Sequence, residues 1–285
     1  MNTRIIAVGN QKGGVGKTTT TINLAAAVAE RKKKVLLVDV DPQANATSGL
    51  GREKVPGTSI YGALLGESPA SEAIKFTDVP RLDIIPGEVD LAGAEIEIAR
   101  MDNYLHRLRD ALQPLKEAGK YDFIFLDCPP SLGILTMNAF CAADGLLVPL
   151  QSEYYALEGL SVILGLIDRL RDGGANPNLR LEGIVLTMFD RRTNLAMEVA
   201  SDVRTKLQGV VYDSVIPRSV RLSEAPSHGK PITVFAPSSP GAEAYRSLAK
   251  EFLRRQNIES IDPAARPVDP SEAVLDSAVP PPPSE

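Results

Sequence analysis

The feature that most constrains the fold of this chain is a glycine-rich loop at residues 12–19, with the sequence KGGVGKTT. It lies between a β-branched run at residues 5–8 and a helical pattern at residues 18–30. Glycines allow the backbone to form a nest of inward-pointing N–H groups, which bind phosphate oxygens together with the N-terminus of the following helix. A tight strand-to-helix turn could use the same glycines, but the Lys-Thr-Thr sequence favours a phosphate-binding loop.

Two side chains of this loop have separate roles toward a bound nucleotide. Lys17 is placed to reach the β and γ phosphates, and the Thr18 hydroxyl is placed to bind Mg²⁺. The loop departs from the pattern G-x-x-x-x-G-K-[ST], because Gln11 replaces the first glycine and a second lysine, Lys12, lies within the loop. We therefore expect ATP and Mg²⁺ as cofactors. The expected nucleotide contacts in the loop are Gln11, Lys12, Gly13, Gly14, Val15, Gly16, Lys17, Thr18 and Thr19.

Short β-branched runs alternate with helical patterns along most of the chain. The expected strands are residues 5–8, 35–39, 82–85, 123–127, 146–149, 184–188 and 211–217. The expected helices are residues 18–30, 104–118, 157–171, 195–207 and 242–255. This alternation predicts an α/β fold: a single P-loop NTPase domain over residues 1–256, with a mostly parallel central β-sheet and helices on both faces. Ligands of such sheets bind beyond the carboxyl ends of the strands.

Three aspartates stand at or just beyond the carboxyl ends of expected strands. Asp39 and Asp41 belong to one strand end, and Asp127 ends another strand. Mg²⁺ prefers oxygen ligands and keeps several waters, so Thr18, Asp39 and Asp127 are the expected metal site, with Asp127 acting through water. Since Asp39 and Asp41 are two residues apart, one can serve the metal and the other the attacking water. A cap or turn role is the alternative for Asp41, because Pro42 follows it.

Composition limits the other classes of function. No apolar run approaches the roughly 20 residues that cross a bilayer, and no signal-peptide pattern precedes the first strand, so we expect a cytoplasmic protein without a membrane partner. The two cysteines, Cys128 and Cys141, are too few for a disulfide scaffold, and His106 and His228 lack zinc-ligand spacing. We expect reduced thiols and no structural metal.

The net charge of −5 conceals two segments of opposite sign. Residues 257–285 contain six acids, one arginine and seven prolines, which predicts a disordered acidic tail. Residues 191–256 contain eleven Lys or Arg and six Asp or Glu, a surplus of five positive charges. The acidic balance of the whole chain therefore does not exclude a nucleic-acid partner.

With these residues in place, the chain closely resembles the ParA/Soj family of chromosome and plasmid partitioning ATPases, a group with a deviant P-loop that also includes MinD and the nitrogenase iron protein. The resemblance runs from about residue 3 to residue 255 and rests on five segments that occur in order. These are residues 10–19, 39–51, 127–131, 152–159 and 215–231.

The resemblance implies hydrolysis of ATP to ADP and phosphate by an ATP-sandwich homodimer. Lys12 of one subunit would contact the nucleotide of the other, much as an arginine finger acts across an interface. Asp41 would orient or activate the hydrolytic water, so that Lys12, Lys17 and Asp41 are the expected catalytic residues. The resemblance also places Pro217 and Arg218 near the adenine base.

The same resemblance implies DNA segregation on the nucleoid. The ATP-bound dimer would bind double-stranded DNA without sequence preference, and a ParB-type centromere-binding partner would stimulate hydrolysis. Neutralisation of DNA phosphates by basic side chains suffices for such binding. A solvated surface role is the alternative for each basic residue. The candidate DNA contacts are Arg192, Arg218, Arg221, Lys230 and Lys250.

Two other functions use the same kind of loop. A MinD-like membrane-associated division-site regulator needs a C-terminal amphipathic helix with a basic flank, and the acidic, proline-rich end of this chain argues against it. An iron–sulfur reductase component needs cysteine ligands from each subunit. Cys128 and Cys141 fit buried packing residues instead. We therefore expect the partitioning function.

Overall fold

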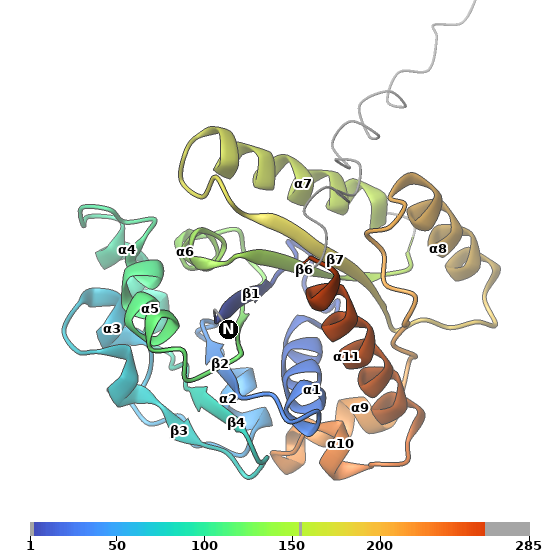
Figure 1. Cartoon of the computed structure of the whole chain (residues 1–285), viewed down its shortest axis with the longest axis horizontal. Coiled ribbons are helices and arrows are strands. Elements are labelled where there is room, and N and C mark those ends of the chain that lie inside the picture. The colour runs from blue at the N-terminus through green and yellow to red at the C-terminus, as the bar shows by residue number, and fades with distance from the viewer. Residues whose placement is uncertain (1–2, 154–155, 260–285) are drawn as a thin grey trace, which may run out of the picture.

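The computed structural model describes residues 3–153 and 156–259. Its centre is a seven-stranded sheet with the strand order β3-β4-β2-β5-β1-β6-β7 (Figure 1). Neighbouring strands are parallel except β3 and β4, which are antiparallel, so the expected mostly parallel sheet is confirmed. The strands are β1 Arg4–Val8, β2 Val35–Asp39, β3 Lys75–Phe76, β4 Leu82–Ile85, β5 Phe123–Asp127, β6 Gly145–Gln151 and β7 Arg180–Thr187.

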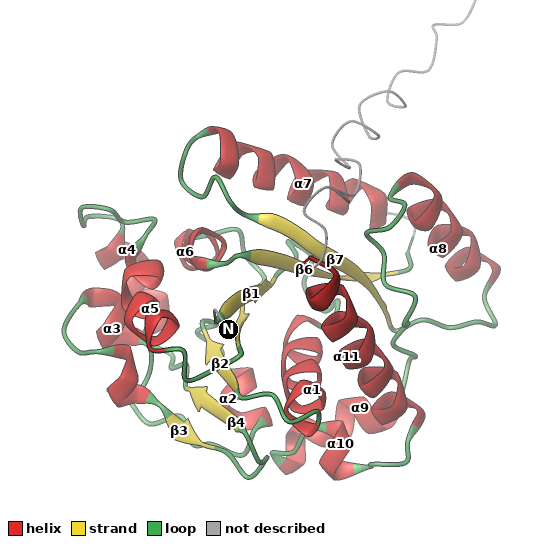
Figure 2. Cartoon of the chain, in the orientation of Figure 1, coloured by secondary structure: helices red, strands yellow, loops and turns green. Residues whose placement is uncertain are grey.

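Helices cover both faces of this sheet (Figure 2). Successive residues of a strand point to opposite faces. Ile5 and Ala7 of β1 therefore belong to one core with α4 to α8, whereas Ile6 and Val8 belong to a second core with α1 and α11. The helices are α1 Lys17–Glu30, α2 Asn45–Gly49, α3 Tyr61–Leu65, α4 Leu91–Ile98, α5 Arg107–Ala118, α6 Ile134–Ala142, α7 Ala156–Asp172, α8 Asn194–Lys206, α9 Val220–Glu224, α10 Ile232–Phe235 and α11 Pro240–Glu259, with the 3-10 helices η1 Ala70–Ala73 and η2 Ala225–His228.

The three central strands bring the expected site loops to one edge. Every residue of β2 and β5 is buried, as nearly continuous apolar runs in a sheet covered on both faces require. Asp127 of β5 is the register partner of both Val8 on β1 and Asp39 on β2. The carboxyl ends of these strands are therefore level, and the loops that follow them lie together.

One expected strand, residues 211–217, is not a strand, and this prediction is wrong. The segment makes isolated parallel bridges at its first and last residues. Between them, the Asp213 and Ser214 N–H groups donate to the Glu251 carboxylate of α11 at 2.9 and 3.0 Å. Because these N–H groups are bonded to a side chain, the hydrogen-bonded ladder with β7 is interrupted.

The other differences concern short elements and helix ends. The two-residue β3 and the four- or five-residue helices α2, α3, α9 and α10 are too short for apolar periodicity to reveal. The helices α4 and α6, of 8 and 9 residues, were not expected either, and α6 is buried on nearly all sides, so it shows no polar face. The helix expected at 104–118 begins at Arg107, and α11 continues to Glu259, beyond the expected domain boundary at residue 256. The acidic tail expected at 257–285 lies, from residue 260 onward, outside the described residues.

Burial and helix composition bear on two further expectations. Over residues 3–153 and 156–259, no helix combines the length and the apolar character needed to span a membrane. Cys128 and Cys141 are free, with exposures of 0% and 2%, so their expected packing role is confirmed. Burial raises the pKa of Cys141 to about 11 and the pKa of Cys128 above its usual range. Both thiols therefore stay protonated near neutral pH.

Candidate functional site

The loop between β1 and α1 forms an open cradle. Gly14 and Gly16 have φ angles of +75° and +85°, a left-handed conformation that side chains disfavour. A Cβ atom added at Gly13 or Gly14 would meet no atom within 4 Å, so both residues border open space. The Thr187 hydroxyl at the end of β7 donates to the Val15 carbonyl at 2.8 Å and anchors the loop to the sheet. The cradle is held in shape and remains accessible.

The N-terminus of α1 faces the loop without a side-chain cap. Gly16 is the N-cap residue, and the first turn contains no acidic residue, so the first N–H groups of the helix remain available to an anion. Lys17 is 6% exposed, and its Nζ donates to the Lys12 carbonyl at 2.9 Å, across the loop. Burial lowers the pKa of Lys17, and the charge of Asp127 opposes that shift. This geometry suits a phosphate group.

Lys12 leaves the same loop on its exposed side. Its ammonium group forms an ion pair with Glu153, and its N–H donates to Asn10 Oδ1 at 3.0 Å. The side chains of Lys12 and Glu153 are 46% and 47% exposed. A pair this exposed contributes at most about 1 kcal/mol to stability. Lys12 can therefore leave Glu153 at little cost, and Gln11 beside it is also exposed.

Two fully buried carboxylates lie side by side at the sheet edge. Asp39 and Asp127 are register partners on β2 and β5, as the sequence predicts for a shared site. Asp39 Oδ2 accepts from the N–H and the hydroxyl of Thr47, both at 2.7 Å. Asp127 Oδ1 accepts from the Thr21 hydroxyl at 2.8 Å, whereas its buried Oδ2 has no hydrogen-bond partner in the described part of the chain.

The electrostatics of this pair fit a divalent cation. Burial raises the pKa of Asp39 to about 6, although hydrogen bonds from Thr47 lower it. Burial also raises the pKa of Asp127 well above its usual range, the Asp39 charge adds to the rise, and the hydrogen bond from Thr21 opposes it. No group of three or more His, Cys, Asp or Glu side chains suited to a metal occurs among the residues described. A cation here would need the Thr18 hydroxyl, water and phosphate oxygens as further ligands, which is the usual mode of Mg²⁺.

Asp41 lies two residues beyond β2 and is 6% exposed. Its Oδ1 accepts from the Gln43 N–H at 2.9 Å, and its carbonyl accepts from the Ala44 N–H at 2.8 Å. Ala44 has a φ of +48°, a conformation that a side chain adopts where its surroundings enforce it. The turn role expected of Asp-Pro is therefore present. Burial lowers the pKa of Lys17, and the charge of Asp41, like that of Asp127, opposes this shift, so the fixed carboxylate lies near the loop.

The segment expected near the adenine base lies beside the end of β7. Pro217 bridges to Phe189, and the Arg218 N–H donates to the Phe189 carbonyl at 3.3 Å. Met188, which precedes Phe189, has a φ of +48°. Its Cε lies 3.8 Å from where a Cβ atom at Gly16 would be. The segment is therefore adjacent to the phosphate cradle.

The basic residues expected to bind DNA are exposed, but two of them have acidic partners. Arg192 pairs with Asp190 at 2.7 Å, and Arg221 pairs with Glu224 at 3.0 Å. The hydrogen bonds from Arg192 hold the pKa of Asp190 at about 2. The exposed set is Arg192, Arg218, Arg221, Lys230 and Lys250. Arg192 and Arg218 lie on neighbouring loops joined at Phe189, whereas Lys250 lies on α11.

Sequence reasoning misses four residues that hold the site together. They support the buried carboxylates, position the loop or pair with its outer lysine: Asn10, Thr21, Thr47 and Glu153. Thr21 follows Thr18 by three residues and so lies on the same helix face, so this spacing could have predicted Thr21 as a site residue. Thr47 follows Asp39 by eight residues, within the segment 39–51. Glu153 reaches the site from a segment 141 residues beyond Lys12, where the loop sequence does not reveal it.

Comparison with known proteins finds relatives over most of the chain. The sequence model of a family described as an AAA domain matches residues 3–181. The chromosome partitioning protein ParA of Myxococcus xanthus (strain DK1622) is 52% identical over 259 residues, 90% of this chain and 90% of the relative. The sporulation initiation inhibitor protein Soj of Bacillus subtilis (strain 168) is 53% identical over 249 residues, 87% of this chain and 97% of the relative. A crystal structure of cobyrinic acid a,c-diamide synthase from Mycobacterium smegmatis with bound ATP analog and magnesium matches with a TM-score of 0.78 and 36% identity, over 93% of this chain and 98% of that chain.

Proposed function

The chain belongs to the ParA/Soj family of chromosome partitioning ATPases, and we propose that ATP and Mg²⁺ at residues 12–19 pair two copies of it into a DNA-binding dimer. Partitioning relatives are 52% and 53% identical to it, so the alternative of a MinD-like division-site regulator is not supported. The observation that carries the proposal is the exposed position of Lys12 on a cradle whose inner cation is Lys17.

Phosphate binding would exchange partners within the loop. The N–H groups of the loop and of the first turn of α1 bind phosphate oxygens. Lys17 Nζ then turns from the neutral Lys12 carbonyl to a phosphate oxygen, and a charge-assisted hydrogen bond is roughly twice as strong as a neutral one. The exchange is favourable because the buried Lys17 ammonium group then pairs with a negatively charged phosphate oxygen instead of a neutral carbonyl.

The buried carboxylates and the Thr18 hydroxyl would hold the metal on the inner side of the phosphates. Mg²⁺, when bound, neutralises charge on the β and γ phosphates. Asp127 has a buried oxygen that no described residue hydrogen-bonds, and Asp39 lies beside it, so both carboxylates are better accommodated with a cation nearby. Asp41 lies outside this pair, and its turn to Gln43 fixes it where it can orient the attacking water.

The outer lysine would serve the neighbouring subunit. Two nucleotides at a shared interface bring several negative charges together, and a cation from each subunit lowers their repulsion. Lys12 is held in the isolated chain by an exposed ion pair with Glu153, so releasing it costs little. ATP therefore makes pairing favourable, whereas the loss of the γ phosphate weakens it.

Pairing would double the basic surface available to DNA. Each additional phosphate contact releases counterions, so binding is independent of sequence and falls steeply with salt. Arg192 and Arg221 are the main candidates, with Arg218, Lys230 and Lys250 as further ones. A ParB-type partner that stimulates hydrolysis would release the dimer from the nucleoid. We assign this activity to residues 1–256, with residues 257–285 as an acidic extension.

The test is a DNA mobility shift compared with liposome pelleting, each with ATP, ADP or no nucleotide. Retention of nonspecific duplex DNA with ATP alone supports the proposal, whereas retention on liposomes contradicts it. Arg192→Ala combined with Arg221→Ala should weaken DNA binding and reduce its salt dependence. Arg100→Ala, an exposed arginine outside the basic set, is the matched control.

A further inference from the structure

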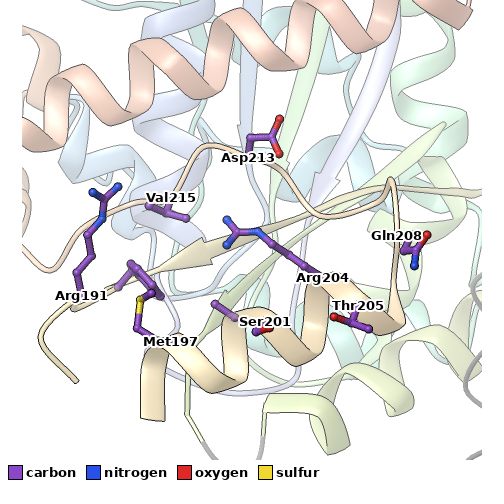
Figure 3. A pocket seen from close by; sticks show the side chains of 10 residues that line it. Arg191, Met197, Ser201, Arg204, Thr205, Gln208, Asp213 and Val215 are labelled. Carbon is purple, nitrogen blue, oxygen red and sulfur yellow. The ribbon is translucent and has the colours of Figure 1, made fainter. Parts of the chain in front are cut away.

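A groove of about 660 Å³ lies between α8 and the segment that follows it. Its lining shares no residue with the phosphate loop or the buried carboxylates. Phe189, Met197 and Val215 provide apolar surface, and Arg191 and Arg204 provide positive charge. Figure 3 shows Arg204 reaching from α8 toward the opposite wall, with Arg191 and Met197 grouped near Val215.

The two arginines are not neutralised by the rest of the described chain. Neither the Arg191 nor the Arg204 side chain has an ion pair or a hydrogen bond with another described residue. Met197 is 51% exposed, which is high for a large apolar side chain. Asp213 is the acid in the lining, so the groove retains a positive surplus. Apolar surface beside free guanidinium groups suits a short segment with apolar residues flanked by acids.

The chain itself contains such a segment. Residues 272–276 have the sequence EAVLD, in which Val274 and Leu275 lie between Glu272 and Asp276. We propose that residues 272–276 of this chain bind in the groove, with the two apolar side chains on its apolar lining and the two acids beside its arginines. The docking requires neither nucleotide nor DNA.

The described chain ends beside the groove. Arg255, in the last turns of α11, donates to the carbonyls of residues 209–211 at 2.8 to 3.4 Å, and its guanidinium lies 3.9 Å from the Tyr212 ring centre. The segment held in this way leads directly into the groove wall at Val215. The chain from residue 259 to residue 272 can span at most about 45 Å. The acidic segment can therefore reach the groove of its own subunit.

A tethered segment also has an advantage over free competitors. A short tether gives an effective concentration of about millimolar, so weak docking contacts suffice within one chain. The docked acids would lie near Arg192, the neighbour of Arg191 in sequence, and would oppose DNA phosphates there. This consequence, unlike the docking itself, rests on the proposed DNA binding.

The test uses an introduced fluorophore, because the chain contains no tryptophan. In the full chain without nucleotide, the Leu275→Trp indole should emit at shorter wavelength and resist acrylamide more than the Ser284→Trp indole. Adding Arg204→Glu should reduce the docked-to-free ratio about fivefold, and a further Asp276→Lys should restore it. Lys206→Glu, on the same helix but outside the lining, should change nothing.

Three results would overturn the proposal. Indoles from Leu275→Trp and from a second reporter, Val274→Trp, could both be as exposed as that from Ser284→Trp. The emission and acrylamide protection of the Leu275→Trp indole could be unchanged by Arg204→Glu, which would exclude this groove. The docked fraction could also increase with protein concentration, which would mean that the groove binds the segment of a second copy.

Discussion

Replacing Asp127 by asparagine should stabilise the metal-free protein at pH 8. The rise in the pKa of Asp39 from 3.8 to about 6 corresponds to about 3 kcal/mol of destabilisation when that carboxylate ionises. Asp127 is equally buried, faces the Asp39 charge and has an Oδ2 without a hydrogen bond among the described residues, so its ionisation is also unfavourable. The amide retains the acceptor for Thr21 but leaves a buried N–H group unpaired, which costs about 1 kcal/mol. Taking the Asp39 value for its neighbour Asp127, the expected net gain is about 2 kcal/mol.

The pH dependence gives this prediction its sign. A carboxyl group whose pKa is raised by folding contributes stability below its unfolded pKa, and that stability is lost as the pH rises through the folded value. Urea unfolding with a chelator should therefore show the Asp127→Asn gain at pH 8 and little gain at pH 5. Asp102→Asn, an exposed aspartate, should change stability by less than about 0.5 kcal/mol at both pH values. An Asp127→Asn protein that is less stable than wild type at pH 8, or equally stabilised at both pH values, would refute the reasoning.

Three further predictions address the loop, the water and the interrupted strand. Gly14→Ala should weaken ATP binding about tenfold by calorimetry, since a side chain at a φ of +75° costs roughly 1–2 kcal/mol, whereas Gly13→Ala should weaken it less. Asp41→Ala should retain ATP yet hydrolyse it at least about 100-fold more slowly in a phosphate-release assay, and a wild-type rate would exclude its role. Glu251→Gln should lower stability by about 1–3 kcal/mol at pH 7. Burial raises the pKa of Glu251, but hydrogen bonds from two backbone N–H groups bring it below the usual 4.5. The stability that the Glu251 carboxylate contributes is therefore lost on acidification, and the difference in unfolding free energy between wild type and Glu251→Gln should become smaller below pH 4.5.

The sequence predicts the centre of this fold because local pattern and tertiary environment agree there. The strands that end at Asp39 and Asp127 are apolar throughout, and burial on both faces is what such runs require. The glycine conformations at 14 and 16 follow equally from the loop sequence. The expected helices are also present, because each is long enough to show its apolar face.

The remaining features depend on partners far apart in sequence. Residues 211–217 have the composition of a strand, but Glu251 of α11 takes two of the N–H groups that a strand would pair. Lys12 meets Glu153, 141 residues further along the chain, through loops that only the assembled sheet edge brings together. Local periodicity cannot report such contacts, because it carries no information about which distant side chain arrives.

Light scattering of the full chain with Mg²⁺ and ATP tests the central claim most directly. The Asp41→Ala protein, in which hydrolysis should be slow, should double in mass from 30.5 kDa with ATP and remain a monomer with ADP. Adding Lys12→Ala should keep the chain single while ATP still binds, whereas Lys206→Ala, an exposed lysine elsewhere, should permit pairing. A chain that stays single with ATP, or that pairs equally well without Lys12, would contradict the account.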